Sequence, residues 1–181
     1  MPFWSLLNAK PILWSLQLMT APAIGQTVPD FTVLATSGKT ISLTDLQGRN
    51  WVIYFYPKDS TPGCTQEGQD FRDHYAEFAE LGTEIFGVSR DSLKSHENFK
   101  CKQAFPFDLI SDADETLCGL FDVIKQKNMY GKQVQGIERS TFLIDGEGRL
   151  VREWRKVSVK GHVEKVLEAV REQRFQHQKV L

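Results

Sequence analysis

The 181-residue sequence has few cysteines, no long apolar run and no excess of charge of one sign, and each absence argues against a class of protein. Its three cysteines form no CxxC pair, which argues against a structural zinc site and a thioredoxin-type dithiol. The sequence has 22 Lys and Arg residues and 23 Asp and Glu residues. This balance argues against nucleic-acid binding through an overall positive charge. With 41% hydrophobic and 25% charged residues, the sequence is typical of a globular protein of about one domain.

The first 23 residues are interpreted as an N-terminal tail or a weak signal-like extension, followed by one domain over residues 24–181. The apolar run at residues 12–19 is far shorter than the ~20 residues that span a bilayer, so no membrane association is expected. Residues 21–23 have the small-x-small pattern of a signal-peptide cleavage site, although only one positive charge precedes them. A cytoplasmic location is expected. Two alternatives stay open: a cleaved signal leading to the periplasm, and an extension ahead of a start at Met19.

The rest of the sequence alternates between strand-like runs and helical spacing. Residues 51–56 are continuously β-branched or aromatic, which is typical of a central strand covered on both faces. Apolar residues over positions 62–81 recur at helical spacing. Further strands are expected at residues 31–35, 41–43, 85–88, 107–110, 139–145 and 149–155, and further helices at 92–104, 113–122 and 162–172. This alternation predicts a three-layer α/β fold, with a central mixed sheet flanked by helices.

A cysteine with the features of a nucleophile follows the predicted central strand. Thr61 precedes Pro62, so we expect Thr61 at the N-cap of a helix and Pro62 at its first position. Cys64 then lies in the first turn, where free N–H groups and the helix dipole favour a thiolate. The thiolate is the reactive form of cysteine, so Cys64 is a candidate nucleophile. The alternative is a buried and inert cysteine.

The segment YFYPKDSTPGCT, residues 54–65, resembles the active-site signature of peroxiredoxins, P-x-x-x-T-x-x-C. The segments NMYGK at 128–132 and GIERSTFLID at 136–145 are similar to the bacterioferritin comigratory protein (PrxQ) branch of that family. Such matches run from about residue 25 to about residue 172. The resemblance implies a thioredoxin-like fold, in agreement with the α/β alternation. It also implies a thiol-dependent peroxidase that reduces hydrogen peroxide and organic hydroperoxides.

The resemblance assigns roles residue by residue. Cys64 matches the peroxidatic cysteine, and Thr61 matches the hydroxyl that hydrogen-bonds the thiolate and the bound peroxide. Arg139 matches the arginine that holds the thiolate ionised; its five donors and permanent charge can serve sulfur and oxygen together. Pro57, matched to the residue that shields the thiolate, and Gly63 are expected to line the substrate pocket. The alternatives are a surface ion pair between Arg139 and its neighbouring glutamate, and a simple loop proline.

The sequence departs from many family members at the resolving cysteine, because position 69, five residues after Cys64, is Gln. Another subgroup places this cysteine in the following helix, where Cys101 matches it. Cys101 lies two residues from Phe99, about 200° around a helix, so it points away from a predicted core side chain. Flanking lysines favour its ionisation. The alternative is an incidental surface cysteine. Cys118, beside apolar neighbours, is expected to be a small buried hydrophobe.

By this resemblance, Cys101 resolves the oxidised Cys64 as an intramolecular disulfide that thioredoxin or a similar thiol reduces. The resemblance also implies a monomer and no metal, haem or flavin. The competing hypotheses are a one-cysteine peroxidase resolved by an external thiol, and a non-catalytic thioredoxin-fold binding or chaperone module. The histidines show no metal-ligand spacing, and we expect His74 and His96 to be solvated.

Disulfide formation is expected to require local unfolding. The pocket must hold Cys64 beside Thr61 and Arg139, whereas a disulfide needs Cα atoms within about 7 Å. We therefore expect Cys64 and Cys101 to lie farther apart than ~7 Å in the reduced protein. Because glycine weakens a helix by roughly 1 kcal/mol relative to alanine, Gly68→Ala is expected to slow disulfide formation.

Overall fold

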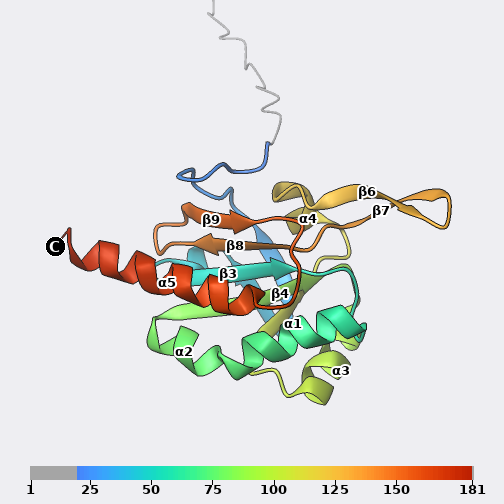
Figure 1. Cartoon of the computed structure of the whole chain (residues 1–181), viewed down its shortest axis with the longest axis horizontal. Coiled ribbons are helices and arrows are strands. Elements are labelled where there is room, and N and C mark those ends of the chain that lie inside the picture. The colour runs from blue at the N-terminus through green and yellow to red at the C-terminus, as the bar shows by residue number, and fades with distance from the viewer. Residues whose placement is uncertain (1–19, 181) are drawn as a thin grey trace, which may run out of the picture.

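The computed structural model describes residues 20–180, and a seven-stranded mixed sheet forms its centre (Figure 1). The strand order is β2-β1-β5-β4-β3-β8-β9. The strands are β1 (Thr32–Ala35), β2 (Lys39–Ser42), β3 (Asn50–Phe55), β4 (Thr83–Ser89), β5 (Asp108–Ser111), β8 (Ser140–Ile144) and β9 (Leu150–Trp154). The β3–β4 and β4–β5 pairs are parallel, and the other pairs are antiparallel. The predicted α/β fold with a mixed sheet is confirmed.

Four helices cover one face of this sheet (Figure 1). They are α1 (Pro62–Asp73), α2 (Tyr75–Glu80), α3 (Leu93–Gln103) and α5 (His162–Gln178). Among residues 20–180, the helical elements on the other face are the short helix α4 (Thr116–Leu120) and the 3-10 turn η1 (Thr44–Leu46). The three predicted layers are therefore present, but one helical layer is thin.

The central strand β3 places consecutive side chains on opposite faces of the sheet. Val52 and Tyr54 pack under α1, α2 and α5, whereas Ile53 and Phe55 pack against α4 and η1. Each of these side chains is at most 1% exposed. Burying one such side chain stabilises the fold by about 1.5–3 kcal/mol, so β3 is a rigid support for the loop that follows it.

Four features differ from the expected pattern. The helix expected over residues 62–81 is broken at His74, whose φ of −100° and ψ of 2° separate α1 from α2. Helix α4 has five residues, half the expected length, whereas α5 continues to Gln178. An unexpected hairpin of β6 (Ile124–Met129) and β7 (Lys132–Ile137) projects from the body of the protein (Figure 1).

The predictions for the N-terminal tail stay predictions. The apolar run at residues 12–19, including Met19, lies outside the described residues. Within residues 20–180, no helix has both the length and the apolar character needed to cross a bilayer.

Candidate active site

Cys64 lies at the start of α1, directly after the loop that follows β3. Thr61 is the N-cap, with the extended φ of −83° and ψ of 154°, and Pro62 is the first helical residue. The Thr65 N–H donates to the Thr61 carbonyl at 2.8 Å, which closes the first turn around Cys64. The cysteine is 2% exposed. Its placement in the first helical turn is as predicted.

Arg139 reaches Cys64 from the other side of the site. It directly precedes β8, which pairs with β3 so that Ser140 lies opposite Phe55, at the strand end nearest the cysteine loop. The Nη2 atom of Arg139 donates to Cys64 Sγ at 3.4 Å. The side chain is only 16% exposed. Two residues 75 positions apart in the sequence are thus brought into contact, as the resemblance implied.

A third member of this group, Glu67, was not predicted from the sequence. The Nη1 atom of Arg139 donates to Glu67 Oε2, while Glu67 Oε1 is buried and has no hydrogen-bond partner in the described part of the chain. Burial raises the pKa of Glu67 to about 7, and the nearby Arg139 charge only partly opposes this rise. Arg139 therefore bridges a buried carboxyl group and the Cys64 sulfur. The only sequence signal was the i, i+3 spacing of Glu67 from Cys64, which puts both on one helix face.

The guanidinium of Arg139 stays charged in this setting. Burial lowers the pKa of Arg139, but Glu67 and Cys64 outweigh that effect and leave it above its ordinary value. A permanent positive charge, oriented by Glu67, therefore faces the sulfur.

Thr61 differs from the expectation in its hydrogen bond. Its Oγ1 donates to the Lys58 carbonyl at 2.8 Å, whereas the resemblance implied a bond to the Cys64 thiolate. A hydroxyl has one hydrogen, and this one is held by Lys58. The Thr61 oxygen is therefore available as an acceptor, so it suits the O–H of a peroxide better than a thiolate.

The two expected pocket residues lie in different surroundings. A Cβ added at Gly63 would lie 3.2 Å from Arg139 Nη2, so the missing side chain leaves room for the guanidinium. Pro57 is exposed in the loop after β3. Its shielding role stays a prediction.

Cys101 lies in the last turns of α3 and is exposed, whereas Phe99 is buried, so the predicted orientation of Cys101 is confirmed. Both Cys64 and Cys101 are free thiols. The C-terminal end of α3 is tied to α1 by two hydrogen bonds: Gln69 Nε2 donates to Gln103 Oε1 at 2.9 Å, and Arg72 Nη1 donates to the Gln103 carbonyl at 2.8 Å. The two cysteine-bearing helices are therefore neighbours, and the resolving role stays a prediction.

Gly68 is a packing residue of this helix contact. A Cβ at Gly68 would lie 2.3 Å from Phe105 Cζ and 2.9 Å from Cε1, which is a severe clash. The expectation for Gly68→Ala, which considered helix propensity alone, is therefore wrong in its premise.

Cys118 is fully buried in α4, on the opposite face of the sheet from Cys64. Burial, together with the nearby Asp112 carboxylate, raises the pKa of Cys118 well above its ordinary value. An unreactive thiol is the result, in agreement with the predicted structural role.

His96 contradicts the prediction of a solvated histidine, because it is 0% exposed. Its Nδ1 lies 2.8 Å from Asp59 Oδ2, and its Nε2 lies 3.0 Å from the Ile110 carbonyl. Polar neighbours in the sequence suggested a surface position, but α3 turns this residue toward β5. His74 is also half-buried and pairs with Glu77.

Asp59, Asp91 and His96 lie close enough together to suggest a metal site, with candidate ligand atoms within 4.8 Å of one another. These atoms already have protein partners. Ser89 Oγ donates to Asp91 Oδ2 at 2.5 Å, and the Asp59 N–H donates to the same oxygen at 3.0 Å. The cluster is a satisfied hydrogen-bond network, and its chemistry does not call for a cation.

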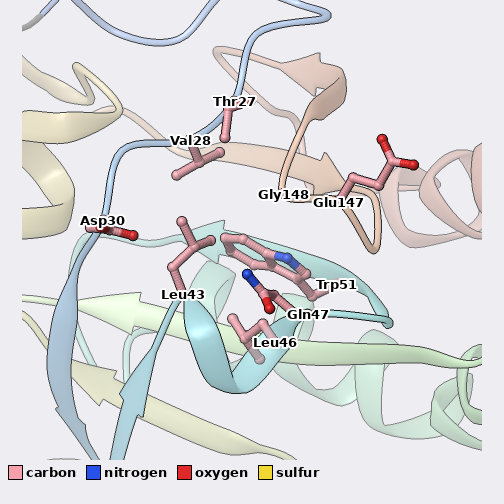
Figure 2. Close-up of a pocket in the computed structure, with 9 residues that line it drawn as sticks. All are labelled: Thr27, Val28, Asp30, Leu43, Leu46, Gln47, Trp51, Glu147 and Gly148. Atoms are coloured by element: carbon pink, nitrogen blue, oxygen red, sulfur yellow. The ribbon is translucent and has the colours of Figure 1, made fainter.

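A cavity of about 310 Å³ lies beneath the segment that precedes β1 (Figure 2). It is lined by Thr27, Val28, Asp30, Leu43, Leu46, Gln47, Trp51, Glu147 and Gly148. Its apolar wall belongs to the core on the α4 side of the sheet, whereas Cys64 packs on the opposite side. This cavity is therefore not part of the cysteine site.

Comparisons with a family model and with known proteins point to the same family. The AhpC/TSA family matches residues 24–153. Peroxiredoxin Bcp of Xanthomonas campestris is 60% identical over 139 residues, which cover 76% of this chain and 87% of that protein. Peroxiredoxin Bcp of Bacillus subtilis is 52% identical over 149 residues, or 82% and 95% of the two chains.

Solved structures agree with this result. One is the Xanthomonas campestris bacterioferritin comigratory protein, described for its alkyl peroxide reduction activity. It has a TM-score of 0.77 and 56% identity, and the match covers 80% of this chain and 92% of that one. A cysteine-to-serine mutant of Xylella fastidiosa PrxQ has a TM-score of 0.81 and 43% identity, with coverage of 85% and 98%.

Proposed function

The chain belongs to the AhpC/TSA family as a peroxiredoxin of the Bcp type, and we propose that Cys64 is the residue with which it reduces peroxides. Peroxiredoxins are thiol-dependent peroxidases, so the class of enzyme follows from the family. The contact between Arg139 Nη2 and Cys64 Sγ is the observation that carries this assignment.

In the proposed first step, the Cys64 thiolate attacks one oxygen of the peroxide. An S–O bond forms, the O–O bond breaks, and the leaving oxygen departs with its electron pair and takes a proton from solvent to become water or an alcohol. Cys64 becomes a sulfenic acid. The fixed charge of Arg139 stabilises the negative charge that spreads from sulfur to the leaving oxygen. The Thr61 oxygen accepts a hydrogen bond from the peroxide O–H.

Hydrogen peroxide and organic hydroperoxides are the proposed substrates. The alkyl peroxide activity described for the Xanthomonas campestris relative, 56% identical to this chain, supports the organic class.

In the proposed second step, the Cys101 thiolate attacks the Cys64 sulfenic sulfur. An S–S bond forms, and the S–O bond breaks so that its electron pair leaves with hydroxide, which takes a proton from solvent to become water. Thioredoxin or a similar dithiol then reduces this intramolecular disulfide and is itself oxidised. The exposure of Cys101 and the packing of α3 on α1 support this step.

We further propose that residues 24–181 form the catalytic domain and act as a monomer, because one chain carries both cysteines. The cytoplasm is the proposed compartment, since thiol reductants there keep cysteines reduced.

The test is peroxide consumption with thioredoxin and thioredoxin reductase, comparing three cysteine-to-serine variants. Cys64→Ser should abolish turnover, because a hydroxyl has no comparable anion at neutral pH. Cys101→Ser should consume one peroxide per chain but lose thioredoxin-dependent turnover. Cys118→Ser is the matched control and should keep turnover, since Cys118 packs on the opposite face of the sheet.

Each competing hypothesis predicts a different result. Full thioredoxin-dependent turnover in Cys101→Ser would replace the two-cysteine mechanism with resolution by an external thiol. Peroxide consumption that persists in Cys64→Ser would remove Cys64 from the reaction. Peptide mass spectrometry of the oxidised protein should identify a Cys64–Cys101 disulfide.

A further inference from the structure

The loop between β3 and α1 contains a buried carboxylate that the proposed chemistry does not use. Asp59 is 7% exposed although it lies among exposed loop residues. Its Oδ1 accepts a hydrogen bond from the Tyr56 hydroxyl at 2.7 Å. Its Oδ2 accepts one from Ser95 Oγ at 2.7 Å and lies 2.8 Å from His96 Nδ1. The carboxylate therefore joins the active-site loop to the first turns of α3.

The contacts of His96 determine where its protons lie. Its Nε2 faces the Ile110 carbonyl, which can only accept, so Nε2 carries a hydrogen. The short contact between Nδ1 and Asp59 Oδ2 requires a second proton between those atoms. Burial raises the pKa of Asp59, but the hydrogen bonds from His96 and Tyr56 outweigh it and leave the pKa below its ordinary value. Whichever of the two atoms holds this proton, Asp59 and His96 form a buried hydrogen-bonded pair with no net charge.

The residue after Asp59 has a strained backbone. Ser60 has a φ of 60°, in the left-handed region that side-chain-bearing residues rarely adopt. Such a conformation persists only where the surrounding structure holds it. Asp59 is held by its side chain and also by its N–H, which donates to Asp91 Oδ2 at 3.0 Å. On the other side of Ser60, Thr61 begins α1 and closes the turn around Cys64.

We propose that Asp59 and His96 are positioning residues that hold Ser60 in its left-handed conformation and so fix Thr61 and the first turn of α1 for the peroxide step. The proposal rests on the proposed roles of Thr61 and Cys64. Because α3 carries both His96 and Cys101, the helix with the proposed resolving thiol also supports the loop of the peroxidatic one.

The first test measures the second-order rate constant for Cys64 oxidation by hydrogen peroxide, in a Cys101→Ser background that stops the reaction at the sulfenic acid. Asp59→Ala should lower this rate constant about tenfold, because Ser60 then relaxes from a conformation disfavoured by roughly that factor. His96→Ala should have the same effect. Asp59→Asn should stay within about threefold of the parent, because an amide can still accept from Tyr56 and donate to a neutral His96.

The rescue variant separates positioning from general destabilisation. Glycine adopts the left-handed region without cost, so Ser60→Gly added to Asp59→Ala should restore the rate constant to within about threefold of the parent. His74→Ala is the matched control, because it removes a histidine–carboxylate pair at the start of α2 and leaves the loop untouched. Its rate constant should equal that of the parent.

A second readout does not depend on peroxide. In the reduced protein, the Thr65 amide bonds to the Thr61 carbonyl, so its hydrogen exchange reports the first turn of α1. Asp59→Ala should accelerate Thr65 exchange while β3 amides keep their protection, and Ser60→Gly should reverse the change. Absence of any reaction with peroxide in the parent would refute the proposed function, and Thr65 exchange would still decide the positioning role.

Two results would overturn the proposal: parent-like rates and Thr65 exchange in Asp59→Ala, or no restoration by Ser60→Gly in either readout. If the alanine variants fail to fold, Tyr56→Phe removes a single hydrogen bond from Asp59. Faster Thr65 exchange in that variant would support the proposal, and unchanged exchange would overturn it.

Discussion

Replacing Gly68 with alanine is expected to loosen the contact between the two cysteine-bearing helices, although alanine is the better helix former. Gly68 lies on the buried face of α1, one turn after Cys64. The new Cβ would lie 2.3 Å from Phe105 Cζ and 2.9 Å from Cε1. Phe105 lies just after the C-cap residue of α3 and is 4% exposed. It has little room to yield, since it packs edge-on against Phe99 and stacks on Phe107, both with centroids 5.1 Å away.

Two opposing effects decide whether Gly68→Ala stabilises or destabilises the protein. The gain in helix propensity is about 1 kcal/mol, whereas overpacking a filled core costs about 1–3 kcal/mol. We therefore expect a net loss of about 1 kcal/mol, concentrated where α1 meets the end of α3. A loss of that size makes the locally unfolded state, in which α1 and the end of α3 have separated, about five times more populated. Disulfide formation should accelerate by about that factor, and Cys64 oxidation should change little.

Stopped-flow fluorescence after a single equivalent of peroxide can separate sulfenic acid formation from disulfide formation. Gly119→Ala in α4 is the matched control, because its Cβ would meet nothing within 4 Å. That variant should gain stability without changing either rate. Slower disulfide formation together with a higher unfolding temperature in Gly68→Ala would refute the steric argument and show that helix propensity outweighs the clash with Phe105.

Three further changes test the charges of the site and the fold. Arg139→Lys should slow Cys64 oxidation at least tenfold, because one ammonium group cannot bridge Glu67 and Cys64; a near-parental rate would argue against the two-donor geometry. Burial raises the pKa of Asp108, but hydrogen bonds from Lys100 and Lys39 outweigh it and hold the pKa at about 2. The contribution of Asp108 to the free energy of unfolding is therefore present above pH ~4 and is lost as the pH falls toward 2. Asp108→Asn should remove this acid-sensitive contribution of about 1 kcal/mol, as measured by urea unfolding at pH values from 2 to 6. Glu67→Gln should flatten the dependence of stability on pH between about 4.5 and 7, as measured by thermal unfolding.

The sequence predicted the elements whose pattern is local. The continuous apolar run of β3 and the Thr61–Pro62 helix start both have short-range signals, and both lie where expected. The β6–β7 hairpin lacks such a signal. Its strands, IKQKNM and KQVQGI, are mostly exposed, so no alternation of polar and apolar residues marks them. Its turn uses Tyr130 and Gly131 at positive φ, without the Asn-Gly or Asp-Gly pair that usually signals a hairpin.

The missed site residues share another cause, because their environment comes from distant parts of the chain. Glu67 looks like an ordinary surface glutamate until Arg139, 72 residues away, reaches it. His96 lies between polar neighbours, and only the placement of α3 on β5 and on the Asp59 loop buries it. Gly68 similarly depends on Phe105. The family resemblance pointed to Cys64 and Arg139, but it did not predict the contacts that Glu67, His96 and Gly68 make with distant residues.

Glu67 and Cys64 draw on the same guanidinium, which links the stability of the fold to the chemistry of the site. Burial raises the pKa of Glu67 from 4.5 to about 7, so the folded protein retains a proton that the unfolded chain releases. Stability is therefore full below pH 4.5 and falls as the pH rises through 7, by at most about 3 kcal/mol. Over the same interval a growing fraction of Glu67 is ionised, and its negative charge increasingly offsets the positive charge that Arg139 presents to the Cys64 sulfur.

An uncharged glutamine at position 67 still accepts a hydrogen bond from Arg139 but does not titrate. Glu67→Gln should therefore lose both the fall in stability and any step near pH 7 in the rate of Cys64 oxidation, whereas the exposed control Glu80→Gln should keep both. Parallel pH profiles for Glu67→Gln and the parent would contradict this prediction, because they would show that Glu67 does not change its protonation state over this range.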